Sequence, residues 1–294
     1  MPGRKYKARQ YNEAAMRANV VRDYYDNLGE SEWGRLEKDA YHPLEWLTHI
    51  HFLEMHLPKR GAVLDAGGGP GRYAIFVAKR GLRVVLFDIS RVQIAIARRK
   101  ASEMRVPSGL IDYVEGALPD LSRFSNACFD AVICFGPLSH LIDRKVRESA
   151  ITELIRVARP GAPIFISVIN RYGVYRTILK KPSLQAELIR PDHRKTFEEG
   201  VHLGHPGKGP GMFTDAFFFR PDELRKAVED RGVEVITMAA CEGLAAHLGE
   251  SLAELAKDKR KWKKWMDIHW QTCTDPHIIG ISEHLLLVGR KKRR

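Results

Sequence analysis

The stretch Val63-Leu64-Asp65-Ala66-Gly67-Gly68-Gly69-Pro70-Gly71-Arg72 decides the fold of this chain. A short apolar run ends at Asp65 and breaks into four glycines, and a helical pattern, residues 73–78, follows at once. Glycines let the backbone turn tightly and approach a ligand, because no Cβ is in the way. The N-terminus of the following helix directs free N–H groups to the same place. The segment therefore predicts a strand, a ligand-binding turn and a helix.

The spacing of the glycines narrows the class of ligand. They fall as G-x-G-x-G at Gly67, Gly69 and Gly71, whereas the dinucleotide fingerprint G-x-G-x-x-G requires a glycine where this chain has Arg72. A second apolar run ends at Asp88, and an acid in that position binds the ribose hydroxyls of adenosine-type cofactors. A nicotinamide- or flavin-binding unit and an ordinary βαβ turn are the alternatives.

Strand, acid, G-x-G-x-G, helix, strand and acid in this order resemble the class I S-adenosylmethionine-dependent methyltransferases. The predicted strands fall at 62–66, 83–88, 111–115, 129–135, 162–169, 233–239 and 283–288, and helices at 71–80, 91–104 and 142–159. Such alternation is typical of a doubly wound parallel sheet. The predicted fold is α/β, a doubly wound seven-stranded, mostly parallel sheet with an antiparallel last strand at its edge and a helical cap.

Changes in composition divide the chain into segments. They are a disordered basic tail at 1–10, an N-terminal helical cap at 11–57, the Rossmann-like cofactor-binding core at 58–169, a lid or substrate insertion at 170–219, the completion of the sheet at 220–289 with a helical insertion at 241–280, and a basic tail at 290–294. Long glycine-rich connections such as 170–219 usually form lids or binding loops. We expect the cap and both insertions to cover the carboxyl ends of the strands, where ligands bind.

The resemblance implies a cofactor site at these strand ends. Its residues are Asp65, Gly67, Gly68, Gly69 and Gly71 for the methionine part of S-adenosylmethionine, Asp88 for the ribose, Ile89, Gly116, Ala117 and Leu118 for adenine, and Phe135 and Gly136 near the sulfonium. Ala117 stands where many members carry an acid, which leaves that side-chain contact with adenine in doubt. The alternative role for Asp88 is to cap the helix that begins near Ser90.

The resemblance also places Pro137 beside the transferred methyl group and makes His140 the candidate general base, because histidine titrates near neutrality. Alternatively, His140 caps a helix or hydrogen-bonds the cofactor loop. The His/His/Asp spacing in the glycine-rich insertion matches no standard site, so no metal is predicted. The candidate acceptor contacts are Tyr25, Trp33 and Arg35 in the cap and His202 and His205 in the insertion.

The net charge of +12 suggests a nucleic-acid partner until the charges are located along the chain. Nine of them lie in 1–10 and 290–294, so these tails either contact phosphates weakly or only solubilise the protein. The run 257–265, rich in lysine and tryptophan, either binds phosphates and stacks bases or forms an amphipathic helix. Scattered cysteines and the lack of a membrane-length or signal-like apolar run favour a cytoplasmic location.

We therefore expect an enzyme that moves a methyl group from S-adenosylmethionine to an oxygen or nitrogen of a small molecule by in-line displacement, leaving S-adenosylhomocysteine. Holding donor and acceptor in line lowers much of the barrier, so the sequence does not identify the acceptor. Capping insertions enclose a pocket, which suits a small acceptor. The alternatives are an RNA methyltransferase and a non-catalytic S-adenosylmethionine-binding partner or sensor. No membrane partner is expected, and the oligomeric state stays open.

Overall fold

The computed structural model describes residues 17–38, 41–191, 193–204 and 213–293. The N-terminal segment is helical in these ranges. It consists of a helix that includes residues 17–28, then α2 (Glu30–Gly34), η1 (Arg35–Glu37) and α3 (His42–His56).

A seven-stranded sheet forms the middle layer, with the strand order β3-β2-β1-β4-β5-β9-β8. The five strands from β3 to β5 run parallel, and β9 is antiparallel to both β5 and β8. The predicted α/β fold with a mostly parallel sheet and an antiparallel last strand is confirmed. The strands are β1 (Ala62–Ala66), β2 (Arg83–Asp88), β3 (Ile111–Glu115), β4 (Ala131–Phe135), β5 (Pro163–Ile169), β8 (Val233–Ala240) and β9 (His284–Lys291).

The expectation that the last strand of the chain lies at the sheet edge is wrong. β9 lies between β5 and β8, and β8 is the edge strand. The four consecutive apolar residues Leu285, Leu286, Leu287 and Val288 are fully buried, because their side chains pack alternately into the cores on the two faces of the sheet. A continuous apolar run of this kind is typical of a strand covered on both faces.

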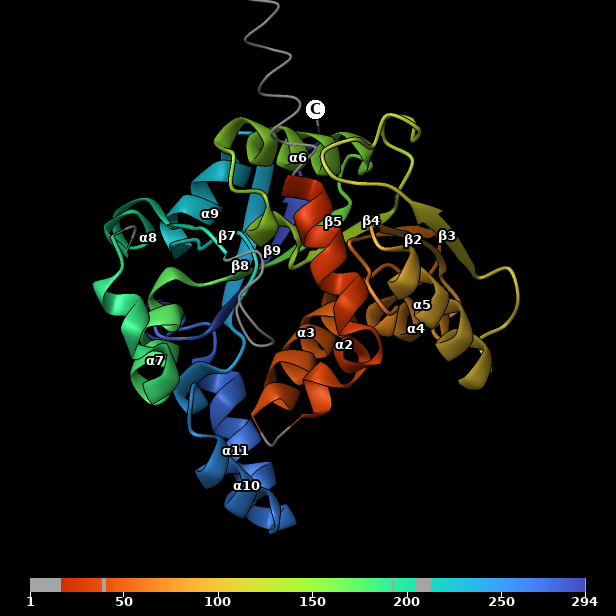
Figure 1. The fold of residues 1–294 in the computed structure, drawn as a ribbon. Coiled ribbons are helices and arrows are strands. Elements are labelled where there is room, and N and C mark those ends of the chain that lie inside the picture. The colour runs from red at the N-terminus through yellow and green to blue at the C-terminus, as the bar shows by residue number, and fades with distance from the viewer. Residues whose placement is uncertain (1–16, 39–40, 192, 205–212, 294) are drawn as a thin grey trace, which may run out of the picture.

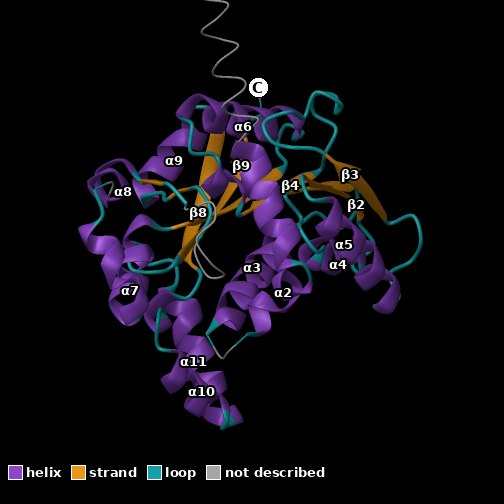
Figure 2. Cartoon of the chain, in the orientation of Figure 1, coloured by secondary structure: helices purple, strands orange, loops and turns teal. Residues whose placement is uncertain are grey.

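Helices cover both faces of the sheet (Figures 1 and 2). α3 packs on one face together with α4 (Arg72–Ala78) and α5 (Arg91–Glu103), and the other face carries α6 (Arg144–Val157) and α9 (Pro221–Glu229). Each of these helices buries an apolar stripe against the sheet. The carboxyl ends of the parallel strands are left for the loops that build the site.

The chain between β5 and α9 leaves the sheet, in the segment predicted as the first insertion. Arg171 attaches this segment to the protein body, since its fully buried guanidinium donates to Glu223 on α9 at 2.7 and 3.0 Å and to the carbonyl of Phe218 at 3.1 Å. The elements of the segment are α7 (Arg171–Lys180), η3 (Pro182–Ile189), α8 (His193–Glu199), β6 (Val201–His202) and β7 (Ala216–Phe217).

The second insertion, 241–280, packs beside the site rather than over it. Leu252 and Met266 from this insertion form an apolar cluster with Tyr41 and Leu44 at the start of α3. None of residues 241–280, all of which are described, lines the central cavity, so the expectation that they cover the strand ends is wrong. The elements of the insertion are η4 (Gly243–Ala245), α10 (Gly249–Ala256), α11 (Lys259–Thr272) and α12 (Pro276–Ile279).

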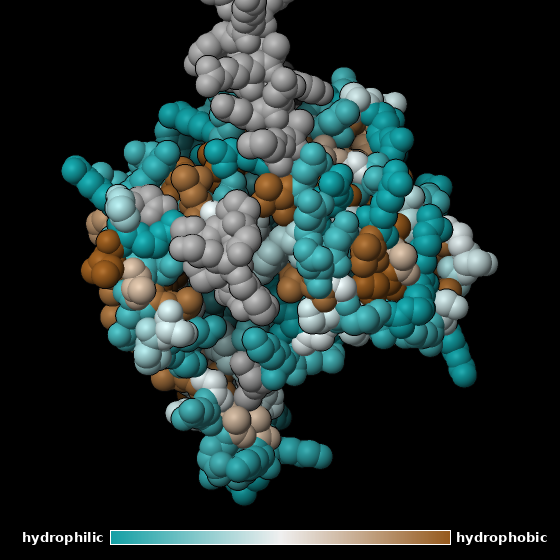
Figure 3. All heavy atoms as spheres, viewed as in Figure 1, coloured by the Kyte–Doolittle hydropathy of each residue, from teal (hydrophilic) through white to brown (hydrophobic). Residues whose placement is uncertain are grey.

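The lysine- and tryptophan-rich run 257–265 includes the first half of α11, and its first two residues precede the helix. Trp262 and Trp265 are half-buried and pack on the cluster around Tyr41, whereas the lysines of the run are exposed. Hydrophilic atoms dominate this tip of the molecule in the space-filling view (Figure 3). The tryptophan rings are not free to stack on bases, which favours the amphipathic-helix interpretation.

The structure describes most of the C-terminal basic segment but not the N-terminal one. Residues 1–10 lie outside the described residues. At the other end, β9 continues to Lys291, whose N–H donates to the carbonyl of Ala162 at 3.0 Å, so the predicted tail at 290–294 begins too early. Within the described ranges, no helix has both the length and the apolar character needed to cross a membrane.

We expect Arg171→Met to lower the free energy of unfolding by about 3 kcal/mol, because the substitution leaves the Glu223 carboxylate without its buried partner. Urea denaturation followed by circular dichroism measures the change. Arg225→Met is the matched control, since Arg225 pairs with Glu229 on the exposed face of α9 at 3.4 Å and should cost less than about 1 kcal/mol. Equal losses in the two variants would contradict the anchoring role of Arg171.

Candidate active site

A cavity of about 1160 Å³ opens at the carboxyl ends of β1, β2, β4 and β5. The strand order reverses between β1 and β4, which is where ligands of open α/β sheets bind. The helix that includes 17–28 and the first insertion line its outer part. Because single-ligand pockets usually measure roughly 300–1,000 Å³, the cavity has room for two ligands.

The glycine loop between β1 and α4 forms one wall of the cavity. Gly67, Gly69 and Gly71 have φ values of 76°, 51° and 85°, in the left-handed region that favours glycine. A Cβ on Gly67 would overlap the ring of Pro137, so glycine also lets the turn after β4 pack on the loop. Gly71 does not line the cavity among the described residues, because it begins α4 and packs on Ala97.

Two buried carboxylates, Asp65 and Asp88, end β1 and β2 beside this loop. Asp88 accepts hydrogen bonds from the N–H groups of Gly69 and Ser90, each at 2.8 Å. The N-cap of α5 is Ser90, which accepts the N–H of Gln93, so Asp88 is not the helix cap. Oδ2 of Asp65 is buried and has no hydrogen-bond partner among the described residues. An unsatisfied buried oxygen of this kind indicates a place for a ligand donor.

Burial raises the pKa of both carboxyl groups. It raises the pKa of Asp65 to about 7, with the charge of Asp88 adding to the effect. It raises the pKa of Asp88 to about 6 although two N–H groups favour its ionised form. Ligand groups that carry positive charge or donate hydrogen bonds compensate the cost of burying these charges. The pair is therefore suited to a ligand that has an ammonium group and sugar hydroxyls.

The other predicted cofactor residues are brought to the same cavity. Phe135 lies at the end of β4, where its ring stacks on the buried ring of His49 with 4.2 Å between centroids. Their contacts with a cofactor stay a prediction. The residues that line the cavity beside the loop and the two carboxylates are Ile89, Gly116, Ala117, Leu118, Phe135 and Gly136.

His140 ends η2 (Pro137–His140) and joins three segments of the chain. Its Nε2 lies 2.8 Å from the hydroxyl of Tyr25, and its Nδ1 lies 3.3 Å from the backbone carbonyl of Asp215. Since a carbonyl only accepts, Nδ1 carries the proton and Nε2 accepts from Tyr25. Burial lowers the pKa of His140 to about 4, so its imidazole is neutral at pH 7. Among the described residues, both ring nitrogens of His140 are thus engaged by partners other than a helix end or the cofactor loop.

The structure separates the predicted acceptor contacts into three groups. Trp33 does not line the cavity among the described residues, because its ring is covered by the guanidinium of Arg72 at 4.9 Å and by Lys100. His205 lies outside the described residues. The predicted contacts that line the cavity are Tyr25, Arg35, Pro137 and His202.

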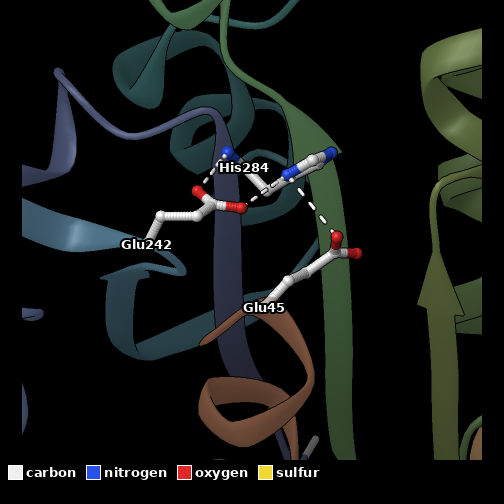
Figure 4. Close-up of side chains that lie close together, drawn as sticks. All are labelled: Glu45, Glu242 and His284. Carbon is white, nitrogen blue, oxygen red and sulfur yellow. Dashed lines mark hydrogen bonds and ion pairs between the residues drawn. The ribbon is translucent and has the colours of Figure 1, made fainter. Parts of the chain in front are cut away.

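A buried ion-pair network that the sequence did not predict forms another part of the wall (Figure 4). Arg35 donates to Glu45 at 2.7 and 3.1 Å, and Nδ1 of His284 donates to Glu242 at 2.7 Å. Burial favours a raised pKa for Glu45, but the cations of Arg35 and His284 hold it well below its usual range. Burial favours a lowered pKa for His284, but Glu45 and Glu242 raise it to about 10.

Glu45, Glu242 and His284 are close enough together to ligate a metal ion, but their atoms are already engaged. Glu242 also accepts the hydroxyl of Ser282 at 2.6 Å and the backbone N–H of His284 at 2.9 Å, and Glu45 is held by Arg35. A protonated imidazole is not a metal ligand. The cluster is therefore an ion-pair network.

The comparisons with known proteins agree with this architecture. Residues 63–161 match the family described as "Methyltransferase domain". The chain is 31% identical over 153 residues to a ubiquinone biosynthesis O-methyltransferase of Chromobacterium violaceum, a match that spans 51% of this chain and 62% of the relative. The corresponding enzyme of Hahella chejuensis is 36% identical over 109 residues, 37% of this chain and 43% of the relative. The chain thus matches less than two thirds of these relatives.

Solved structures show the same fold at low sequence identity. Magnesium protoporphyrin IX methyltransferase from Synechocystis PCC 6803, solved with bound SAH, superimposes with a TM-score of 0.58 at 19% identity over 94% of this chain and all of that one. A SAM-dependent methyltransferase from Methanosarcina mazei also gives 0.58 at 19% identity, covering 83% of this chain and 98% of that one.

A seven-stranded sheet of this order, with a glycine loop after β1 and an acid at the end of β2, defines an α/β protein built to bind a nucleoside-containing cofactor. Together with the family match over 63–161, it shows that these residues form the methyltransferase domain of a class I, S-adenosylmethionine-dependent fold. The predicted family and its cofactor, S-adenosylmethionine, are confirmed.

We expect Asp88→Asn to weaken S-adenosylmethionine binding about 10- to 100-fold, because the ribose hydroxyls lose a charged acceptor. Isothermal titration calorimetry measures the affinity. Asp112→Asn, on the exposed face of the neighbouring strand β3, is the matched control and should bind as the unmodified protein does. An unchanged affinity in Asp88→Asn would show that the cofactor lies elsewhere.

The affinity for S-adenosylmethionine should rise as the pH increases from about 5 to about 8. The free carboxyl groups of Asp65 and Asp88 have pKa values of about 7 and about 6, and the cofactor favours their ionised forms. Binding at lower pH must therefore expel protons. Calorimetry in two buffers of different ionisation enthalpy detects this release, and an affinity that is constant over the range would refute the assignment.

Proposed function

We propose that this protein transfers a methyl group from S-adenosylmethionine to a small, largely apolar molecule held in the same cavity. The observation that carries the proposal is the cavity itself, which has a volume of about 1160 Å³ and is lined by the N-terminal helix and the first insertion as well as by the strand ends. A covered pocket selects a small acceptor over an RNA strand. The alternatives to this function are methylation of RNA and a purely cofactor-binding role.

The cofactor half of the cavity lies between the glycine loop and the ends of β2 and β3. The unpaired Oδ2 of Asp65 suits the ammonium group of the cofactor, and Asp88 suits its ribose hydroxyls. Ile89 and the backbone of 116–118 suit the adenine ring. When bound, S-adenosylmethionine supplies a methyl group on a positively charged sulfur. The residues of the chain hold it in place and exclude water.

The acceptor half lies beyond β4 and is walled mainly by apolar side chains. The curated relatives are named as O-methyltransferases, which favours an oxygen as the acceptor atom. A hydroxyl group held in line with the sulfur needs positioning first and loss of its proton second. The apolar residues of this half are Leu141, Ile142, Val146, Val168, Ile169, Val174, Ile178, Leu184, Phe213 and Phe218.

His140 is the candidate proton acceptor for such a hydroxyl. Its Nε2 is unprotonated and accepts from the Tyr25 hydroxyl at 2.8 Å, and both residues line the cavity. An acceptor hydroxyl that donates to Tyr25 passes its proton to His140 through this hydroxyl. A pKa of about 4 makes His140 a weak base at pH 7, so its contribution falls at the low end of general-base effects.

We also propose that the protein is cytoplasmic and that its basic tails contact nucleic acids weakly. Neither is needed for transfer to a small acceptor.

Incubation of the pure protein with methyl-labelled S-adenosylmethionine and a cell extract, divided into small-molecule, RNA and protein fractions, tests the function. We expect label in the small-molecule fraction. Label in RNA alone would replace the proposal with RNA methylation. Cofactor binding without label in any fraction would favour the non-catalytic role.

We expect His140→Gln to lower kcat about 100-fold with the small-molecule fraction as acceptor, because the proton acceptor is lost. The affinity for S-adenosylmethionine should change less than about twofold, since His140 does not touch the cofactor loop. Tyr25→Phe should give a similar loss. Single-turnover transfer of label measures the step, and an unchanged rate in His140→Gln would remove His140 from the mechanism.

A further inference from the structure

His284 stands at the point of the sheet where an acceptor would lie. It begins β9 and pairs with Ile169 of β5, while Ser167 of β5 pairs with Phe135 at the end of β4. Paired residues and residues two apart share one face of a sheet, so these four side chains lie on the same face. All four line the cavity. His284 lies two strand spacings across the sheet and two residues along it from Phe135, roughly 12 Å away, which places it in the acceptor half.

The two nitrogens of this imidazole have different surroundings. Nδ1 donates to Glu242 at 2.7 Å and lies 3.7 Å from Glu45, which fixes the ring. Nε2 points away from both carboxylates (Figure 4), and no residue in the described part of the chain hydrogen-bonds it. The side chain is 20% exposed, and it lines the cavity. A rigidly held donor with no protein partner thus faces the acceptor half.

The charge of His284 distinguishes a donor from a base. Burial favours the neutral form, but Glu45 and Glu242 raise its pKa to about 10, so Nε2 carries a proton at pH 7. A protonated nitrogen cannot take a proton from a hydroxyl, but it donates a charge-assisted hydrogen bond. The best match to such a donor is an anionic oxygen.

The carboxylates around His284 are engaged by other donors. Glu45 is neutralised by Arg35 through two hydrogen bonds, and Glu242 accepts four donors and lies behind the wall of the cavity. Glu283 accepts the hydroxyl of Tyr41 at 2.5 Å. Other titratable residues that line the cavity include Glu32 in α2, His42 in α3 and Lys181 after α7.

We propose that His284 determines which acceptor the enzyme takes, by donating a hydrogen bond from Nε2 to an anionic oxygen, so that the acceptor is a small apolar molecule with a carboxylate group. The inference rests on the proposed function for the division of the cavity into a cofactor half and an acceptor half. His284 is a specificity residue in this arrangement, and it does not take part in methyl transfer itself.

Benzoate and benzamide test this inference, because the two probes share a flat apolar ring and differ in charge. NMR titrations at pH 7 use the whole protein saturated with S-adenosylhomocysteine. We expect benzoate to bind about tenfold more tightly than benzamide, the usual effect of a charged hydrogen bond, and His284→Gln to abolish the difference. His277→Gln, on a fully exposed side chain of α12, is the matched control and should keep the preference.

Equal binding of the two probes, no binding of benzoate, or an undiminished preference in His284→Gln would overturn the inference. If His284→Gln does not fold, the unmodified protein provides the test through its histidine side-chain nitrogens. Benzoate, and not benzamide, should then shift the Nε2 resonance of the histidine that is still protonated at about pH 8. The preference is measured without methyl transfer, so a protein that shows it but labels no fraction would fail the proposed function and retain this inference.

Discussion

The missing side chain at Gly67 is the constraint on which the rest of the site depends. The ring of Pro137 fills the space that a Cβ would need, so the turn after β1 and the turn after β4 pack as one unit. Pro137 begins the short helix that ends at His140, and His140 holds Tyr25 of the N-terminal helix. Two contacts and the short helix between them therefore connect the cofactor loop, the candidate base and the N-terminal helix that lines the cavity.

The environment of each histidine decides its charge. His140 is half-buried beside a hydroxyl and a carbonyl, and it stays neutral. His284 is half-buried beside two carboxylates, and it stays charged. Groups with opposite shifts in one site can take the roles of proton acceptor and fixed donor. The sheet supports this division, because it holds the two rings at separate strand ends.

The part of the site that the sequence predicted is local in the chain. Asp65, Gly67 and Asp88 lie within one βαβ unit, where strand ends, turn glycines and spacing are all visible in a short window. Glu45, Glu242 and His284 come from three distant segments, and only the placement of β9 beside β5 brings them together. No short pattern around His284 distinguishes it from a histidine at the start of any strand.

Two predictions from the sequence, the lid contact of Trp33 and the position of the second insertion, are wrong for the same physical reason. Trp33 is an aromatic residue of the helical cap, as a lid contact would be, but the cations of Arg72 and Lys100 cover its ring. The second insertion follows the edge strand β8, but its apolar residues pack on the start of α3, which places it beside the cavity. In both cases, a competing tertiary contact that the sequence does not reveal decided the outcome.

The N-terminal helix touches both halves of the cavity. The carbonyl of Tyr25 accepts from Gln93 at 2.8 Å on the cofactor side, and Arg17 pairs with Asp215 of the first insertion at 2.5 Å. Because these residues belong to one helix, a movement of that helix opens both halves of the cavity. Cofactor exchange and product release through such a movement would be coupled, and its rate would set an upper bound on turnover.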